Sequence, residues 1–86
     1  MMAIFTVGAD AIRVNKMREI ADAWGFVGKY EDSERLLQDA KKKRFSYVLV
    51  VDQDALEERI KKELTILNIE IINFNDKKKL EKLVKI

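Results

Sequence analysis

Cysteine and histidine are both absent from this sequence of 86 residues. Without cysteine the chain forms no disulfide and has no thiolate ligand or nucleophile. Without histidine it has no imidazole for metal binding or proton transfer, so Cys–His and Ser–His–Asp catalytic systems are excluded. Mg²⁺ and Ca²⁺ are not excluded, because they prefer oxygen ligands. The lack of cysteine is typical of intracellular proteins, and we expect a cytoplasmic location.

Proline is also absent, and glycine occurs only as Gly8, Gly25 and Gly28. These glycines do not form the G-x-G-x-x-G or P-loop patterns that bind nucleotide phosphates, and Gly8 alone makes no phosphate cradle. No apolar run approaches the roughly 18 residues that cross a bilayer, so we expect no membrane insertion. The first residues contain no basic segment and do not predict a signal peptide.

Charged residues make up 37% of the sequence and hydrophobic residues 48%. This composition predicts one small soluble domain over residues 1–86. The net charge of +2 is unevenly distributed, because residues 1–40 sum to −2 and residues 41–86 sum to +4. Abundant lysine and glutamate point to a thermophilic source, whereas the absence of proline argues against one.

Apolar and β-branched runs predict strands over residues 3–7, 26–30, 45–51 and 69–74. Amphipathic stretches predict helices over residues 12–24, 33–43, 54–67 and 76–86. The expected inward stripe of the third helix consists of Leu56, Ile60, Leu64 and Leu67. The expected N-caps are Asp10, Asp32 or Ser33, and Asn75 or Asp76, while Gly25 and Asn68 are the expected helix stops.

Strands that alternate with helices predict an α/β fold with right-handed crossovers and a parallel sheet covered on both faces. We expect a four-stranded flavodoxin-like or Rossmann-like sheet of order 2-1-3-4, with residues 45–51 as a central strand. Such sheets bind ligands at the carboxyl ends of their strands, beside the point where the strand order reverses. Gly8, Asp10, Asp52 and Asp54 would gather at that edge.

The segment VVDQDALEE, residues 50–58, is similar to the Asp-x-Asp of Toprim domains in primases and topoisomerases. The resemblance implies a minimal Mg²⁺-dependent nucleic-acid enzyme with Asp52, Asp54 and Asp10 as metal ligands. The glutamate that such sites place after their first strand is missing here. A phosphoacceptor like that of response regulators is favoured less, because Asp10 is the only carboxylate at that position.

A structural interpretation competes with the metal site. Asp54 and Glu57 have the spacing of a capping box, in which each side chain accepts from the backbone N–H of the other residue. Asp52 would then be a turn residue at the end of the strand. The sequence favours this role for Asp54 and leaves Asp52 as the better candidate for a functional carboxylate.

Two basic clusters stand out. Lys41, Lys42, Lys43 and Arg44 would bind nucleic acid under the enzyme hypothesis, but they also suit the C-terminal end of a helix, and the sequence favours that role. The second cluster, Lys77, Lys78 and Lys79, lies in the first turn of the predicted last helix, where the helix dipole disfavours cations. It therefore predicts protein binding, with Leu80 and Leu83 beside Lys77, Lys78 and Lys79. We expect helix 76–86 either to pack on its own sheet or to move and dock on a partner.

Three segments resemble the small Rossmann-like protein of the central rotor stalk in the V-type and archaeal A-type ATPases. They are FTVGAD (5–10), GKYEDSERLLQDAKKKRFSYVLVVDQDALEERI (28–60) and LNIEIINFNDKKKLEKLVKI (67–86). The resemblance implies a non-catalytic protein that binds a helical coiled coil in an ion-transporting rotary ATPase and needs no cofactor. We favour this protein-interaction role over the Mg²⁺-dependent enzyme.

Overall fold

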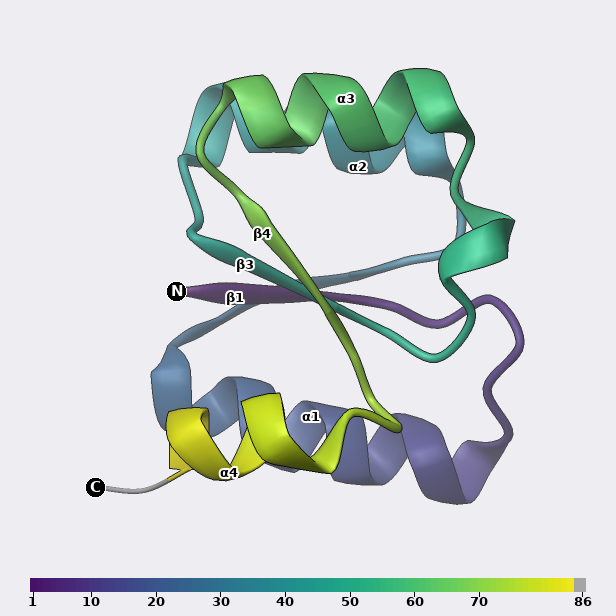
Figure 1. The fold of residues 1–86 in the computed structure, drawn as a ribbon, viewed down its shortest axis with the longest axis vertical. Helices are drawn as coiled ribbons and strands as arrows, with labels where there is room; N and C mark the ends of the chain where they lie inside the picture. Colours follow the sequence, from purple (N-terminus) through teal and green to yellow (C-terminus); the bar gives the residue numbers. More distant parts are fainter. Residues whose placement is uncertain (85–86) are drawn as a thin grey trace.

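The sheet contains four parallel strands in the order β2-β1-β3-β4 (Figure 1). This computed structural model describes the backbone of residues 1–84 and the side chains of residues 1–81. The strands are β1 (Met2–Phe5), β2 (Phe26–Tyr30), β3 (Tyr47–Val50) and β4 (Glu70–Asn73). The predicted α/β fold, with its all-parallel sheet and strand order, is therefore confirmed.

Helices cover both faces of the sheet, in two pairs. One face carries α1 (Ala11–Trp24) and α4 (Lys77–Val84), and the other carries α2 (Ser33–Lys43) and α3 (Glu58–Ile66) (Figure 1). A short 3₁₀ helix, η1 (Gln53–Ala55), precedes α3. The last two residues of predicted helix 76–86 lie outside the described residues. None of the helices in residues 1–84 has the length and apolar character needed to cross a membrane.

The core lies on both sides of the two central strands. Alternate residues of a strand point to opposite faces, so β1 and β3 each contribute to two hydrophobic clusters. The cluster under α2 and α3 includes Ala3, Phe5, Val48 and Val50, and the cluster under α1 and α4 includes Met2, Ile4 and Leu49. All seven residues are buried, and a fully buried large aliphatic side chain stabilises the fold by about 1.5–3 kcal/mol.

Several predicted helix ends are confirmed. Asp10, Asp32 and Asp76 cap their helices by accepting from the backbone N–H groups of Arg13, Glu34 and Lys79 at 2.8, 2.9 and 3.2 Å. Gly25 has φ of 89° after α1, and Asn68 has φ of 61° after α3. Both residues therefore end their helices in the left-handed region that glycine and asparagine tolerate best.

The third helix differs from its prediction. It begins at Glu58, and Glu57 is an N-cap whose side chain makes no capping hydrogen bond, so the predicted Asp54–Glu57 capping box is wrong. Residues 53–55 instead form η1, in which the N–H of Leu56 donates to the carbonyl of Gln53 at 3.1 Å. The predicted inward position of Leu67 is also wrong, because the helix ends at Ile66 and Leu67 is 39% exposed.

Candidate functional site

The ends of β1 and β3 meet at the carboxyl edge of the sheet, as predicted. Gly8 has φ of 85°, and a Cβ added to it would lie 3.3 Å from the Cβ of Asp52. A larger residue at position 8 would therefore be strained in its backbone and crowded by Asp52. The contact places the exits of the two central strands side by side.

The carboxylates at this edge make local backbone contacts. Asp10 caps α1, and Asp52 accepts from the backbone N–H of Asp54 at 3.0 Å. Asp52 is thus the capping residue of η1, and Asp54 is the residue whose amide it satisfies. This contact confirms the turn role that the structural interpretation predicts for Asp52, whereas the capping role predicted for Asp54 is wrong. Asp10, Asp52 and Asp54 are all exposed to solvent.

These carboxylates do not form a cluster that could bind a metal. Among the side chains that the structure describes, no three Asp, Glu, His or Cys residues lie close enough together to hold an ion. Asp10, Asp52 and Asp54 have the oxygen chemistry that Mg²⁺ prefers, but they do not form a common ligand set. No catalytic step through a metal follows from this geometry, and the Mg²⁺ hypothesis stays a prediction.

The basic run of residues 41–44 lies at the C-terminal end of α2. Lys41, Lys42 and Lys43 occupy the last turn, where cations favour the helix dipole, and Arg44 follows in the left-handed conformation with φ of 50°. All four side chains are exposed. Lys43 forms an ion pair with Asp39 at 3.6 Å. The predicted position at a helix C-terminus is confirmed, whereas nucleic-acid binding stays a prediction.

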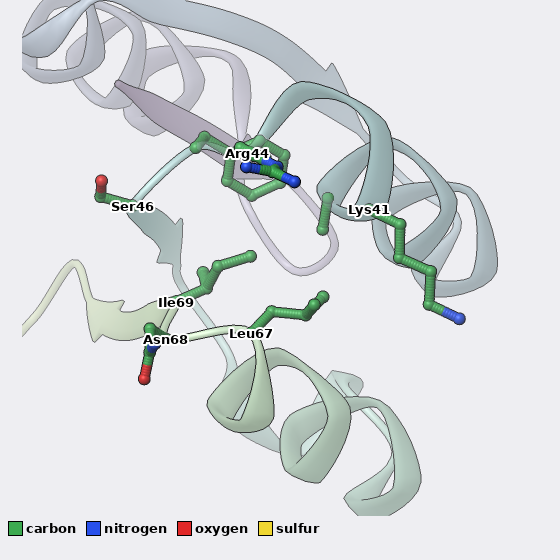
Figure 2. Close-up of a pocket in the computed structure, with 8 residues that line it drawn as sticks. Lys41, Arg44, Ser46, Leu67, Asn68 and Ile69 are labelled. Carbon is green, nitrogen blue, oxygen red and sulfur yellow. The ribbon is translucent and has the colours of Figure 1, made fainter.

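A pocket of about 440 Å³ lies between the C-terminal ends of α2 and α3 (Figure 2). Lys41 and Arg44 line it from the α2 side, and Leu67, Asn68 and Ile69 line it from the turn between α3 and β4. Its walls therefore combine two cations with apolar side chains. The sequence pattern identifies Lys41 and Arg44 but gives no sign that they lie opposite Leu67.

A second pocket, of about 490 Å³, lies where α3 leads into β4 and is lined by Thr65, Asn68, Ile69, Glu70 and Ile71. The two pockets share Asn68 and Ile69, so they form one continuous surface. Ile66 and Leu67, at the end of α3, are 78% and 39% exposed. We call the residues Lys41, Arg44, Ile66, Leu67, Asn68, Ile69, Glu70 and Ile71 the β4-edge surface.

The backbone of β4 is paired on one side only. The N–H groups of Glu70 and Phe74 donate to the carbonyls of Ser46 and Val50 on the β3 side, at 3.0 and 2.6 Å. Because successive residues of a strand point their hydrogen-bonding groups in opposite directions, the N–H groups of Ile71 and Asn73 face away from β3. In the described residues no further strand pairs with that side.

The last helix packs on its own sheet through Leu80. This side chain is half-buried against the cluster under α1 and α4, which fits the default expectation for the helix. Lys77, Lys78 and Lys79 are exposed, and the ammonium of Lys79 lies 3.8 Å from a carboxylate oxygen of Glu70. The side chain of Leu83 lies outside the described residues. Partner binding by these five residues stays a prediction.

Two further polar contacts have no counterpart in the sequence predictions. The hydroxyl of Tyr30, on β2, donates to Asp39 of α2 at 2.5 Å. Burial and this contact raise the pKa of Tyr30 to about 12, and the same hydrogen bond lowers the pKa of Asp39. The two residues are nine positions apart and lie on different elements, so no local sequence pattern predicts their contact.

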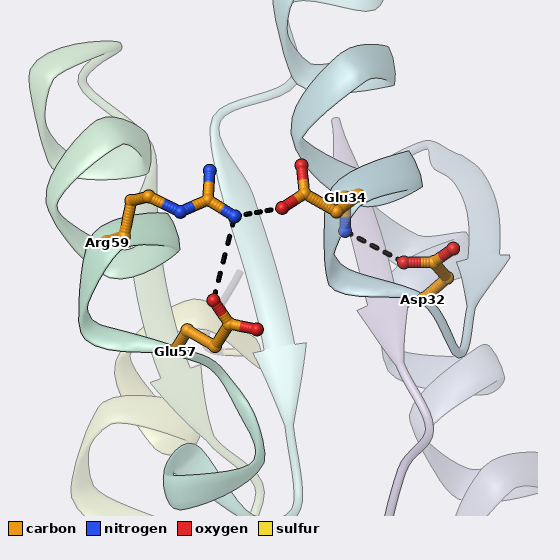
Figure 3. A network of polar contacts seen from close by, with 4 residues as sticks. All are labelled: Asp32, Glu34, Glu57 and Arg59. Atoms are coloured by element: carbon orange, nitrogen blue, oxygen red, sulfur yellow. Dashed lines mark hydrogen bonds and ion pairs between the residues drawn. The ribbon is translucent and has the colours of Figure 1, made fainter.

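The second contact joins α2 and α3 on their solvent side. Arg59 forms ion pairs with Glu34 and Glu57, and the Glu34 contact raises the pKa of the guanidinium (Figure 3). These three side chains are about half exposed or more, so the network lies on the surface. It has the geometry of a structural link between two helices.

Comparison with protein-family models, with curated proteins and with solved structures finds no match for this chain. Functional inference therefore depends on the geometry of the described residues.

Proposed function

We propose that this chain is a non-catalytic protein-interaction domain whose partner docks on the β4-edge surface. The observation that supports this proposal is an open strand edge next to exposed apolar side chains. Within the described residues no strand pairs with the outer side of β4, and Ile66 and Leu67, at the end of the helix that precedes β4, are 78% and 39% exposed. Natural proteins usually protect such edges, because an open edge is a template for pairing with another chain.

The resemblance to the small stalk protein of rotary ATPases supports a more specific form of the proposal. In that form the partner is a helical coiled coil in the stalk of a rotary ATPase. The exposed lysines of α4, Lys77 to Lys79, border the same side of the molecule through the contact of Lys79 with Glu70, so the candidate α4 site and the β4-edge surface adjoin.

Affinity capture with matched variants tests the proposal. Ile66→Ser removes an exposed isoleucine from the β4-edge surface, and Ile12→Ser removes one that is 68% exposed on α1. We expect the wild type and Ile12→Ser to capture the same protein from lysate of the source organism. Capture by Ile66→Ser should fall about tenfold, because burying an isoleucine contributes roughly that much to binding. Equal capture by all three proteins would contradict the proposal.

The enzyme hypothesis makes the opposite prediction and has its own measurement. If Asp10, Asp52 and Asp54 bind Mg²⁺, millimolar MgCl₂ should shift the backbone amide NMR signals of these residues and their neighbours. Under the protein-interaction proposal we expect those signals to stay in place. CaCl₂ at the same concentration distinguishes a selective site from general ion screening.

A further inference from the structure

The β4-edge surface runs from a strand edge to a pair of cations. Its two pockets share Asn68 and Ile69, so a segment lying along β4 would continue into the pocket between α2 and α3. The left-handed residues Arg44 and Asn68 both line that pocket. The turns that end α2 and α3 therefore form its walls.

The backbone of β4 fits an extended partner. Ile71 and Asn73 direct their N–H groups outward, and the register of β4 with β3 is regular from Tyr47↔Glu70 to Val50↔Asn73. A helix already satisfies its own backbone hydrogen bonds, whereas an extended segment brings free carbonyl and N–H groups to such an edge. Strand addition is therefore the binding mode that this edge matches.

The charges of the pocket favour an acidic partner. Lys41 and Arg44 are exposed, and within the described side chains neither forms an ion pair. The acidic residue of the β4-edge surface is Glu70, whose carboxylate lies 3.8 Å from the ammonium of Lys79. A carboxylate near Lys41 and Arg44 would make charge-assisted hydrogen bonds that add specificity to the backbone pairing.

We propose that the β4-edge surface binds an extended acidic segment of another protein, which adds a fifth strand to β4 and places a carboxylate at the wall of the pocket that Lys41 and Arg44 line. This inference rests on the proposed protein-interaction function, and it specifies an extended partner in place of the helical coiled coil. A segment antiparallel to β4 ends at the pocket, so either an acidic side chain or its terminal carboxylate would occupy the site.

Fluorescence anisotropy with two synthetic peptides tests the proposal. One labelled peptide alternates threonine with valine and ends in two glutamates, and the matched peptide ends in two lysines. We expect the glutamate peptide to bind at least tenfold more tightly to the wild-type chain. In NMR spectra its binding should slow hydrogen exchange at the amides of Ile71 and Asn73. Equal affinity for the two peptides would overturn the charge argument.

Charge-matched variants locate the carboxylate. Lys41→Ala combined with Arg44→Asn removes two cations from the pocket, and asparagine tolerates the left-handed conformation at position 44. Lys42→Ala combined with Lys62→Ala removes two cations that line neither pocket. The first pair should weaken binding of the glutamate peptide about tenfold or more, while the second should leave it within about twofold. Equal losses would show only a general charge effect and overturn the site.

Backbone pairing is tested without changing the protein. N-methylation of alternate peptide amides removes the hydrogen bonds on one side of an extended strand. One of the two methylation patterns should abolish binding and the other should preserve it. If both methylated peptides bind like the parent peptide, strand addition is wrong.

Three other occupants would overturn the proposal. Protection of Ile71 and Asn73 in the free protein, with a dimer in sedimentation, would show that a second copy fills the edge. Binding of single-stranded oligothymidylate that the Lys41→Ala/Arg44→Asn variant loses, without peptide binding, would show a nucleic-acid site. Loss of lysate capture in Ile66→Ser, without binding of either peptide, would preserve the proposed function and reject the extended acidic segment.

Discussion

β2 and β4 are both edge strands of one sheet, yet only β2 has an irregular register with its neighbour. From Met2 to Ile4 the central strand β1 advances two residues, while β2 advances three, from Phe26 to Lys29. This extra residue is the mark of a β-bulge, and with the exposed Lys29 it discourages strand addition. β4 pairs with β3 without interruption. The two edges therefore differ in their readiness to accept another strand.

The side chain of Tyr30 is a second feature that distinguishes the β2 edge. A Cβ added to Gly28 would lie 3.2 Å from the hydroxyl of Tyr30, so the tyrosine occupies the space that a side chain would need there. The hydroxyl then bonds Asp39 of α2. Both edge strands line a pocket, of about 410 Å³ at β2 and about 490 Å³ at β4, so the difference lies in the bulge of β2 and in its link to a helix. We call β2, with its irregular register and its link to α2, the closed edge, and β4, with its regular register, the open edge.

The largest effect on the free energy of unfolding is expected for the buried residue that holds β4 on the core. Ile72 of β4 is 1% exposed in the cluster under α1 and α4. Ile72→Ala should lower the free energy of unfolding by about 3 kcal/mol, since truncating a buried isoleucine costs about 2–5 kcal/mol. Urea unfolding followed by far-UV circular dichroism measures this change.

Val27→Ala is the matched change on β2. Val27 is only partly buried against the cluster under α2 and α3, so we expect a cost of about 1 kcal/mol. If Ile72→Ala cost no more than Val27→Ala, β4 would be weakly anchored. Its open edge would then reflect a loosely packed strand, and the binding-surface argument would lose its basis.

The next effect concerns alkaline pH and the closed edge. The pKa of Tyr30 is raised to about 12 from an ordinary value of 10, so the folded state holds this proton more tightly than the unfolded chain. The stabilisation is complete below about pH 10 and is lost as pH rises through about 12. We expect a loss of about 1–2 kcal/mol, less than the full linkage value because Asp39 is partly exposed.

Tyr30→Phe isolates this contribution from the lysines that titrate in the same range. The difference in unfolding free energy between wild type and Tyr30→Phe should be constant from about pH 7 to 9 and shrink toward about pH 12. Urea titrations at each pH measure it. A difference that stays constant throughout this range would mean that the Tyr30–Asp39 contact does not hold the closed edge.

The architecture was predictable because the turn and capping residues indicate the same helices and strands as the spacing of the hydrophobic residues. Gly25 and Asp32 bracket β2, and its predicted bounds, 26–30, match the structure, as do the bounds 33–43 of α2. Agreement of local and global signals is what allows a sequence to specify its fold. The failed capping prediction for Asp54 shows the limit, because two nearby carboxylates can cap the same turn and the backbone geometry decides which does.

The candidate surface was predictable only in parts. The sequence identifies Lys41 and Arg44 as a helix end and Asn68 as a stop, and the strand order implies that β4 is an edge. The pocket, however, forms because Arg44 and Asn68 end two neighbouring helices far apart in sequence. The bulge of β2 and the Tyr30–Asp39 bond likewise depend on tertiary packing, which periodicity does not encode.

The smallest effect is expected from the ionic link between the helices that adjoin the two edges. α2 follows β2 and α3 precedes β4, and Arg59 of α3 pairs with Glu34 of α2 (Figure 3). Both side chains are about half exposed, so the pair is screened by solvent. Arg59→Met should lower the melting temperature by about 2 °C at low salt.

Salt dependence separates the ionic link from packing. In molar NaCl the difference between wild type and Arg59→Met should disappear, because the screening length falls to about 3 Å. Lys62→Met on the same helix, for which the described side chains show no ion pair, should leave the melting temperature unchanged at both salt concentrations. A loss in Arg59→Met that persists in molar salt would mean that its aliphatic stem, and not its charge, joins α2 to α3. The helices beside the open and closed edges would then be coupled by packing, and a partner bound at β4 could influence the β2 edge through it.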